Sequence, residues 1–477
     1  MTHPMLDDGT FVAHDDGLTS GDPLAWPGYE AALGRARERS GSDESVVGGR
    51  ATIAGAAVEV ALFDFSFLGG SVGEVAGERI ARAMERAAAS GRPFVLATAT
   101  GGARMQEGMV SLVQMPKLVA ARRALSRAAV PYIAVLGNPT TGGILASIGS
   151  LADYTIAEEE ATIGFTGPRL VERFTGRSLS ETSHTAASAL TAGLVDTVQP
   201  REVVKERVAE VLNVLRPDKP EDLGRPFGAG PRRGGHDAVW SVGHPTRPST
   251  RELVEGAVDD LVPLHGDRAG TVAAGYTAFG RIAGRRCMVL ATDSKYAPRP
   301  GDLRKARRCL EIAERLRLPV MSVIDTPGAD PSEASEAAGI ASEIARLFDA
   351  MLSLTVPVVS VVTGEGGSGA ALAFATADAL LIYEDAFFSV IGPESAAEIL
   401  WRDAKRADEA ASLLKLTAHD LADLGIADGV LAAPPTPQSL RTAVAYHLGL
   451  LGPPSEDRIR QRARRWRTYG QGSEASS

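Results

Sequence analysis

The sequence predicts an α/β fold in which two copies of one domain follow each other. Buried-strand runs such as Phe94–Ala97 and Tyr132–Leu136 are each entered from a proline, and a longer helical pattern separates them. Strands that alternate with helices indicate layers of helices packed on a sheet. The run that begins at Pro131 is matched by the run that begins at Pro357, an offset of 357 − 131 = 226 residues.

Further landmarks keep this register. Pro93 matches Pro319 at the same offset of 226, and Gly167-Pro168 matches Gly392-Pro393 at 392 − 167 = 225 residues. Within this window both halves run strand, glycine-rich turn, helix of small residues, aspartate, strand and Gly-Pro. Landmarks that hold register over so long a stretch predict an internal duplication.

The elements of the first copy can be placed in order. A helical pattern covers residues 74–89, a strand covers 94–97, a second helical pattern covers 109–128, and a strand covers 132–136. We divide the whole chain into a polar extension with one helical stretch at Tyr29–Arg39 (1–46), a first α/β domain (47–215), a linker rich in Pro, Gly and Arg (216–249), a second α/β domain (250–451) and a charged tail expected to fray (452–477).

The composition excludes several classes of protein. The chain has 477 residues, 44% of them hydrophobic and 23% charged, which is typical of globular proteins. Its net charge of -9 argues against a dedicated nucleic-acid binder, and its two cysteines cannot build a four-cysteine zinc site, so we expect no zinc. No signal peptide is visible, and no apolar run approaches the ~18 residues of a membrane span. We therefore expect a soluble cytoplasmic protein with no membrane or nucleic-acid partner.

Four glycine-rich turns, two in each copy, follow a buried strand and open a helix. They are Thr100–Arg104 and Pro139–Gly143 in the first copy, and Asp325–Ala329 and Gly364–Gly369 in the second. Glycine lets the backbone approach a ligand, and the first turn of a helix leaves amides without partners. Such amides suit a negative charge that develops in the transition state, such as an enolate oxygen. Tight turns alone would need the same glycines, but four equivalent turns favour a ligand site.

Other interpretations of these turns are weaker. No Gly-Lys-Ser/Thr follows any of them, which argues against a phosphate loop. Gly364, Gly366 and Gly369 satisfy Gly-x-Gly-x-x-Gly, but a dinucleotide fingerprint belongs on the first strand of its domain and this turn comes late. Arg104 could hold an anionic group of a ligand or pair with Glu107, and the sequence leaves both open.

Several motifs are specific enough to suggest a family. The first copy carries FLGGSVG (67–73), GGARMQEG (101–108) and PTTGG (139–143). The second carries IDTPGA (324–329), GEGGSG (364–369), SVIGPE (389–394) and ILW (399–401). The first set resembles the β subunit of the acetyl-CoA carboxylase carboxyltransferase family, and the second set resembles its α subunit. The match runs from about residue 50 to 435, so the chain resembles a fusion of the two subunits.

This resemblance implies a crotonase-like (ClpP/crotonase) fold, with each copy a β-β-α spiral. It implies transfer of a carboxyl group from carboxybiotin to the α-carbon of an acyl-CoA, with acetyl-CoA converted to malonyl-CoA as the expected case. Biotin would be the cofactor, attached to a separate biotin carboxyl carrier protein and loaded by a biotin carboxylase. The family builds its site from the first domain of one copy and the second domain of another, which implies a homodimer or larger homo-oligomer.

The resemblance also implies which residues serve each ligand. The expected oxyanion donors, which are the catalytic groups, are Ala103, Gly142, Gly143, Gly366, Gly367 and Gly369. The expected acyl-CoA site comprises Gly101, Gly102, Ala103, Arg104, Gly142 and Gly143. The expected biotin site comprises Gly328, Ala329, Gly366, Gly367, Ser368 and Gly369. The assignment of one ligand to each half could be reversed.

The chain departs from the family pattern in several places. Residues 1–46 contain no cysteine, whereas the β subunit usually begins with a four-cysteine zinc ribbon, and Asn138 replaces the usual Asp. Asp330 replaces a usual Tyr, and Ala370 replaces a usual Gly. The last two leave open a biotin-independent malonyl-CoA decarboxylase or other acyl-CoA enolate chemistry. A non-catalytic carboxylase subunit is a further alternative, but it would need at least one broken turn, and all four are present.

Overall fold

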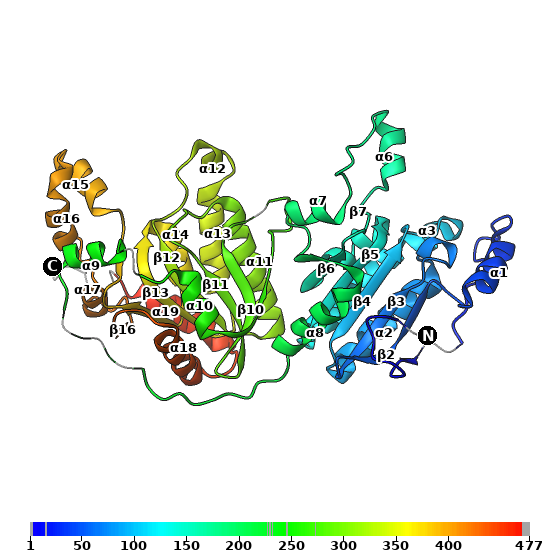
Figure 1. Cartoon of the computed structure of the whole chain (residues 1–477), viewed down its shortest axis with the longest axis horizontal. Helices are drawn as coiled ribbons and strands as arrows, with labels where there is room; N and C mark the ends of the chain where they lie inside the picture. Colours follow the sequence, from blue (N-terminus) through cyan, green and yellow to red (C-terminus); the bar gives the residue numbers. More distant parts are fainter. Residues whose placement is uncertain are drawn as a thin grey trace, which may run out of the picture. The chain divides into compact units, whose positions relative to one another are not determined.

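The computed structural model describes residues 3–14, 17–226, 228, 230, 232–244, 247–271 and 273–469. It divides into two units: the first ends at Leu215 and also takes in Arg268–Thr271, and the second begins at Arg216. Each unit has its own sheet covered by helices, so the α/β prediction is confirmed (Figure 1). The segment expected to be a linker packs on the second unit, where the Lys219 amide donates to the Gly284 carbonyl (3.0 Å).

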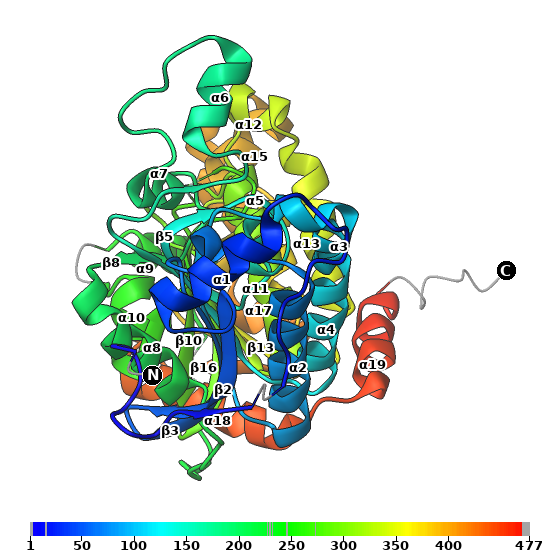
Figure 2. The same ribbon diagram turned by 90° about the vertical axis from the view of Figure 1, so that its right-hand side faces the viewer.

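The sheet of the first unit has the order β1-β2-β3-β4-β5-β6-β8, with β7 paired to the end of β5. Its strands are β1 (Val12–Ala13), β2 (Val46–Ile53), β3 (Ala56–Phe63), β4 (Phe94–Thr100), β5 (Tyr132–Thr141), β6 (Tyr154–Glu158), β7 (Ile163–Gly164) and β8 (Thr197–Gln199). β1, β2 and β3 pair antiparallel, and all pairs from β3–β4 onward are parallel. Helices α2 (Glu74–Ser90) and α4 (Gln114–Arg127) cover one face, and α8 (Val204–Val214) covers the other (Figure 2).

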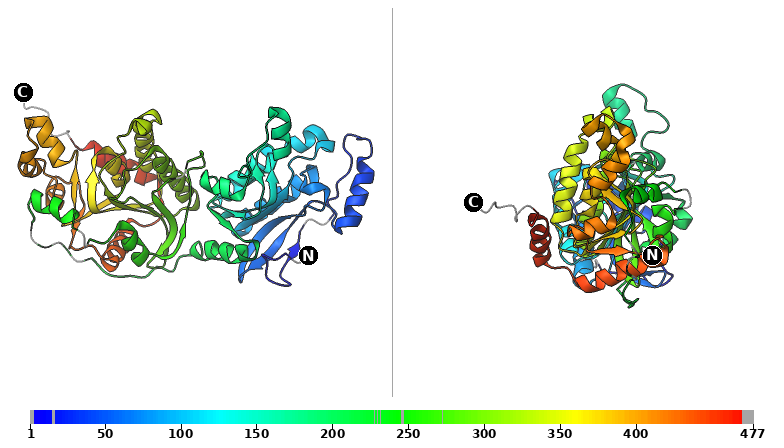
Figure 3. Two further views of the ribbon diagram at one scale, coloured as in Figure 1. Left: turned by 45° about the horizontal axis from the view of Figure 1, so that its top comes forward. Right: turned by 90° about the vertical axis from the view of Figure 1, so that its left-hand side faces the viewer.

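The sheet of the second unit has the order β16-β14-β13-β12-β11-β10-β9, with β15 paired to the end of β13. Its strands are β9 (Asp259–Pro263), β10 (Tyr276–Ile282), β11 (Arg285–Ala291), β12 (Val320–Thr326), β13 (Val358–Gly367), β14 (Ala379–Tyr383), β15 (Phe387–Ser389) and β16 (Gly429–Leu431). Helices α11 (Pro300–Leu316) and α13 (Ile340–Leu352) pack against each other, as do α10 (Thr250–Ala257) and α18 (Pro437–Leu451) (Figure 3).

The strand register reproduces the offset seen in the sequence. Phe94 lies opposite Tyr132 in the first unit, and Val320 lies opposite Val358 in the second. Each residue of the second pair comes 226 positions after its counterpart in the first pair (320 − 94 and 358 − 132). A register irregularity near the end of each strand pair also recurs. Helices α2 and α11 have 17 residues each and begin 226 apart (300 − 74). The predicted duplication is therefore confirmed.

The remaining helices are α1 (Tyr29–Ser40), α3 (Gly108–Leu112), α5 (Gly142–Leu145), α6 (Pro168–Thr175), α7 (Ala186–Thr191), α9 (Gly235–Val242), α12 (Glu333–Ala337), α14 (Ser368–Ala375), α15 (Pro393–Trp401), α16 (Ala407–Leu413), α17 (Ala418–Asp423) and α19 (Glu456–Arg467). Helix α1 confirms the helical stretch expected in the extension. Among the described residues, no helix is long and apolar enough to cross a membrane.

The expectation that the tail frays is wrong for α19. Its Arg462 is buried and donates to Asp378 Oδ2 (2.8 Å) and to the Leu354 carbonyl (3.0 Å). A buried guanidinium needs such acceptors for its five N–H groups, and these acceptors fix the helix against the end of α13. Residues 470–477 of the expected tail lie outside the described part of the chain.

Candidate active site

In the first unit the two glycine-rich turns meet at the ends of neighbouring strands β4 and β5. A Cβ added to Gly142 would lie 2.9 Å from the Gly102 Cα, and a Cβ added to Gly102 would lie 3.3 Å from the Gly142 Cα. Both residues have positive φ, +66° for Gly142 and +112° for Gly102. Side chains rarely adopt this conformation, and here none would fit between the two backbones. The two turns expected to form the acyl-CoA site therefore lie side by side.

The second unit repeats this arrangement. A Cβ added to Gly328 would lie 3.3 Å from the Gly367 carbonyl oxygen, and a Cβ added to Gly367 would lie 2.2 Å from the carbonyl carbon of Pro327. Ser368 stands at the position of Gly142 (368 − 142 = 226) and has the same left-handed backbone, with φ +58°. The expected biotin-side turns are thus also in contact.

Two expected acyl-CoA residues use their amides inside the first turn. The Gly101 amide donates to the Gly69 carbonyl (3.0 Å), and the Gly102 amide donates to Thr100 Oγ1 (2.9 Å). The first bond holds the turn against the segment that follows β3, and the second closes the turn on itself. Neither amide is free to bind a ligand oxygen.

The structure also corrects the expected donor set. The Gly142 amide donates to the Phe165 carbonyl (2.9 Å), so the expectation that it stabilises an oxyanion is wrong. Gly142 contributes its backbone shape instead. Within the described residues, the Ala103 and Gly143 amides have no acceptor. For Gly143 the reason is its place in the first turn of α5, where the helix provides no carbonyl four residues earlier. Both residues are half-buried, and their role as the donors of this unit stays a prediction.

The direction of the Ala103 amide is fixed by Val72. The Val72 amide donates to the Gly102 carbonyl (2.9 Å), and the Arg104 amide donates to the Val72 carbonyl (2.9 Å). The peptides on both sides of Ala103 are therefore tied to one residue, which orients its N–H outward from the turn. Preorganised donors of this kind need no rearrangement when charge develops on a bound oxygen.

In the second unit the counterparts of Ala103 and Gly143 are Ala329 and Gly369, both 226 residues later (329 − 103 and 369 − 143). Ala329 is half-buried, and a Cβ added to Gly369 would meet nothing within 4 Å. Gly366 and Gly367 instead lie within β13, opposite Phe388 and Ser389 of β15. The donor role of Gly366 and Gly367 stays a prediction, whereas Gly369 stands where Gly143 stands.

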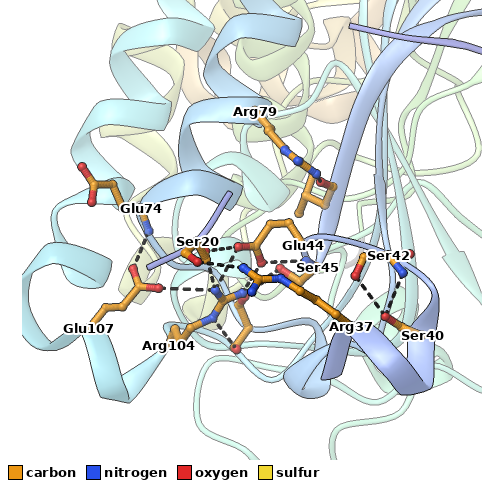
Figure 4. A network of polar contacts seen from close by, with 12 residues as sticks. Ser20, Arg37, Ser40, Ser42, Glu44, Ser45, Glu74, Arg79, Arg104 and Glu107 are labelled. Atoms are coloured by element: carbon orange, nitrogen blue, oxygen red, sulfur yellow. Dashed lines mark hydrogen bonds and ion pairs between the residues drawn. The ribbon is translucent and has the colours of Figure 1, made fainter. Parts of the chain in front are cut away.

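Arg104 does not reach a ligand. Its side chain is fully buried and forms ion pairs with Glu44 and with Glu107, the latter at 3.3 Å (Figure 4). The expectation that it contacts acyl-CoA is therefore wrong, and the alternative pairing with Glu107 is confirmed. Burial opposes the charge of Arg104, but the hydrogen bond and charge of Glu44 raise its pKa above the ordinary value. For Glu44, burial favours the neutral acid, and Arg104 outweighs it and lowers the pKa.

Sequence reasoning missed Glu44 and gave no role to two acids within the second-unit turns. Glu44 lies 60 residues before its partner, and no local motif marks it. Asp325 and Glu365 lie on the strands that carry the second-unit turns, and the Glu365 amide donates to Asp325 Oδ1 (2.8 Å). Burial raises the pKa of Asp325, and burial together with the charge of Asp325 raises that of Glu365. In the described residues no cluster of His, Cys, Asp and Glu is arranged to hold a metal ion.

Comparisons with known proteins agree with this geometry. A family model described as acetyl co-enzyme A carboxylase carboxyltransferase-like matches residues 237–448. The acetyl-coenzyme A carboxylase carboxyl transferase subunits beta/alpha of Salinispora arenicola (strain CNS-205) are 41% identical, over 98% of this chain and 89% of the relative. A probable biotin-dependent acyl-coenzyme A carboxylase beta3 subunit of Mycobacterium bovis (strain ATCC BAA-935 / AF2122/97) is 35% identical, over 98% of both chains.

A solved structure extends the likeness to the fold. The 12S transcarboxylase, a hexamer with methylmalonyl-coenzyme A bound, superposes with a TM-score of 0.76 and 25% identity, over 94% of this chain and 88% of that chain. The expected crotonase-like architecture of two tandem domains is thereby confirmed.

Proposed function

The chain belongs to the acetyl-CoA carboxylase carboxyl transferase family, and on that premise we propose that it carboxylates the α-carbon of acetyl-CoA to give malonyl-CoA. It is a biotin-dependent acyl-CoA carboxyltransferase. Acetyl-CoA is preferred as the acyl substrate because the beta/alpha relatives that match nearly the whole chain carry that substrate in their names.

The observation that carries this proposal is the pair of free amides at Ala103 and Gly143. They lie on two turns whose backbones are in contact, so one oxygen can accept from both. We assign them to the thioester oxygen of acetyl-CoA. This oxygen gains negative charge as the α-carbon loses its proton, and one such donor is typically worth about 10²–10³ in kcat.

The turns of the second unit fit a urea-like oxygen for the same reason. Ala329 and Gly369 repeat the placement of the first-unit donors, and the space beside Gly369 is open. We assign them to the ureido oxygen of biotin, carried on a separate carrier protein that a biotin carboxylase loads. When bound, carboxybiotin would supply the carboxyl group, and the ureido nitrogen freed by breaking the N–carboxyl bond would take up the α-proton of the acyl group. This exchange requires no basic side chain from the protein.

We also propose that the working enzyme contains at least two copies of the chain. Helix α6 stands away from the sheet of its unit and buries none of its residues (Figure 1). Phe174 on this helix is 80% exposed, and Phe165 just before it is 66% exposed. Large apolar side chains that are exposed on one projecting segment are typical of a protein interface. We infer that a second copy covers them, as the hexameric transcarboxylase and the family resemblance suggest.

The test is a steady-state comparison of acetyl-, propionyl- and malonyl-CoA with and without a biotinylated carrier and a biotin carboxylase. We expect carboxylation of acetyl-CoA only when both partners and ATP with bicarbonate are present. A preference for propionyl-CoA would support the assignment as a carboxyltransferase but change the assigned acyl substrate. Loss of CO₂ from malonyl-CoA without biotin would instead identify a decarboxylase, and no turnover under any condition would support a non-catalytic subunit.

A further inference from the structure

We propose that Tyr29 and Glu44, which precede the first α/β domain, are positioning residues for the acyl-side oxyanion turn. They act through Arg104, whose backbone neighbour Ala103 provides one of the two donors. The inference rests on the proposed function, because it concerns how the Ala103 amide is aimed at the thioester oxygen. The proposal gives a function to the N-terminal extension (1–46), which has no cysteine and therefore no zinc ribbon.

The Arg104 guanidinium joins the extension to the turn. Its Nη1 donates to Glu44 Oε2 (3.0 Å), and its Nη2 donates to the Ser71 carbonyl (2.6 Å). Its Nε donates to Ser71 Oγ (3.2 Å). Ser71 directly precedes Val72, the residue that holds both peptides flanking Ala103. Glu44 is therefore linked to the donor peptide through one rigid, planar side chain.

Tyr29 closes the network from helix α1. Its hydroxyl donates to Glu107 Oε1 (2.6 Å) and accepts from Arg104 Nη1 (3.3 Å). Glu107 Oε2 in turn accepts from the Glu74 amide (2.6 Å), at the start of α2. The network thus joins α1, the turn and the first turn of α2.

The environment of the network makes it stiff. Arg104 and Glu44 are fully buried, and Tyr29 is 1% exposed. In the core, charged groups must keep their partners, because a buried charge without one is strongly destabilising. The Arg104 guanidinium also lies over the Phe67 ring, 5.5 Å from its centroid. Because every contact named here would be lost if the Arg104 side chain moved, we infer that it holds the turn in one position.

This rigidity matters because catalysis by amide donors depends on their position. A misplacement of about 1 Å can cost about 10²-fold in rate, while ground-state binding changes little. Loss of the Tyr29 hydroxyl would loosen the network and leave the ring in place. We therefore expect Tyr29→Phe to lower kcat for acetyl-CoA carboxylation roughly tenfold and to leave KM for acetyl-CoA within about twofold.

The matched control is Leu33→Ala on the same helix. Leu33 packs beside Tyr29 and Phe67, but as an aliphatic side chain it takes part in none of the hydrogen bonds or ion pairs of the network. This variant should lower the melting temperature more than Tyr29→Phe does and keep the kcat of the folded enzyme. Equal loss of kcat in both variants would show a merely structural role and overturn the inference, as would a wild-type kcat in Tyr29→Phe. Glu44→Gln, which removes the main counter-charge, should lower kcat further than Tyr29→Phe.

Hydrogen exchange separates this inference from the proposed function. Peptides that cover residues 101–108 should exchange faster in Tyr29→Phe than in wild type, and peptides that cover 326–333 should not change. Unchanged exchange at 101–108 would overturn the positioning role whatever the enzyme catalyses. If the wild type carboxylates no acyl-CoA, the proposed function fails, and the exchange result alone decides whether Tyr29 holds the turn.

Discussion

The turns at Arg104 and Asp330 are equivalent in the two units (330 − 104 = 226), yet they are held in different ways. In both, the backbone amide of this residue donates to a carbonyl of the segment that follows the third strand of the unit, Val72 after β3 in the first unit and Pro298 after β11 in the second. The side chains differ: Arg104 is buried among carboxylates, whereas Asp330 forms an ion pair with Arg299 (3.3 Å), which is 75% exposed.

The side-chain hydrogen bonds of Asp330 stay within its own loop and the start of α12. Its Oδ2 accepts from Ser332 Oγ (2.7 Å) and Ser335 Oγ (2.6 Å), and these hydrogen bonds lower its pKa. The shared backbone bond shows that strand and turn alone give the geometry common to both units. The buried Arg104 side chain with its partners Glu44 and Glu107, which we call the anchor, is present only in the first unit, where we place the enolate oxygen.

The largest effect is expected from removal of this anchor. Arg104→Ala leaves Glu44 and Glu107 in the core without their counter-charge, and breaking a buried pair costs about 3–5 kcal/mol. The urea midpoint of the first unit should fall accordingly. A midpoint equal to that of wild type would show that the network adds no stability and would remove the contrast between the two turns.

A second substitution makes the first unit resemble the second. Gly142→Ser places serine where the second unit has Ser368, at nearly the same φ. In the first unit, however, the new Cβ would lie 2.9 Å from the Gly102 Cα, and neither backbone can move without displacing an amide donor. We expect kcat to fall at least about 100-fold. Ser368→Gly is the reciprocal control and should change kcat far less, because it removes atoms without a new contact.

The pH dependence of stability tests the charge of Glu44. Its pKa is lowered in the folded state, so its contribution is present above the ordinary value of 4.5 and is lost as pH falls through the lowered pKa. The difference in urea midpoint between wild type and Glu44→Gln should therefore be constant above pH 4.5 and shrink below it. A difference that grows on acidification would contradict the assigned ionisation.

The smallest effect is expected at the equivalent position of the second unit. Asp330→Asn keeps a hydrogen-bond acceptor for the serines and loses only an ion pair with Arg299, which is exposed and whose pairing therefore contributes little in water. The urea midpoint and the KM for the biotinylated carrier should stay at wild-type values. A large increase in this KM would show that Asp330 contacts the carrier or its biotin, and the contrast between anchored and unanchored turns would need revision.

The sequence predicted those features that depend on backbone shape. The duplication and the four turns follow from glycine placement and from the constant offset between the two copies, which the sequence shows directly. The contact between Gly102 and Gly142 was not predicted, because it depends on the pairing of β4 with β5. The Gly142 amide could not be assigned, because its acceptor, the Phe165 carbonyl, belongs to a segment 23 residues later (165 − 142) that only folding brings near.

Charged side chains were harder to place for the same reason. Arg104 pairs with Glu44, which is 60 residues away in the sequence, and Arg462 pairs with Asp378, which is 84 residues away. In a sequence, each of these arginines is indistinguishable from a solvated one. Only the fold shows that they are buried and paired, which is why the anchor and the docked helix α19 were missed.

The most direct test of the account is a crystal structure of the enzyme with malonyl-CoA or a stable thioester analogue bound. We expect the thioester oxygen to lie about 2.7–3.1 Å from both the Ala103 and Gly143 amides, the range for oxyanion donors. A thioester oxygen held by other groups, or seated on Ala329 and Gly369 of the second unit, would contradict the assignment of the acyl group to the anchored turn.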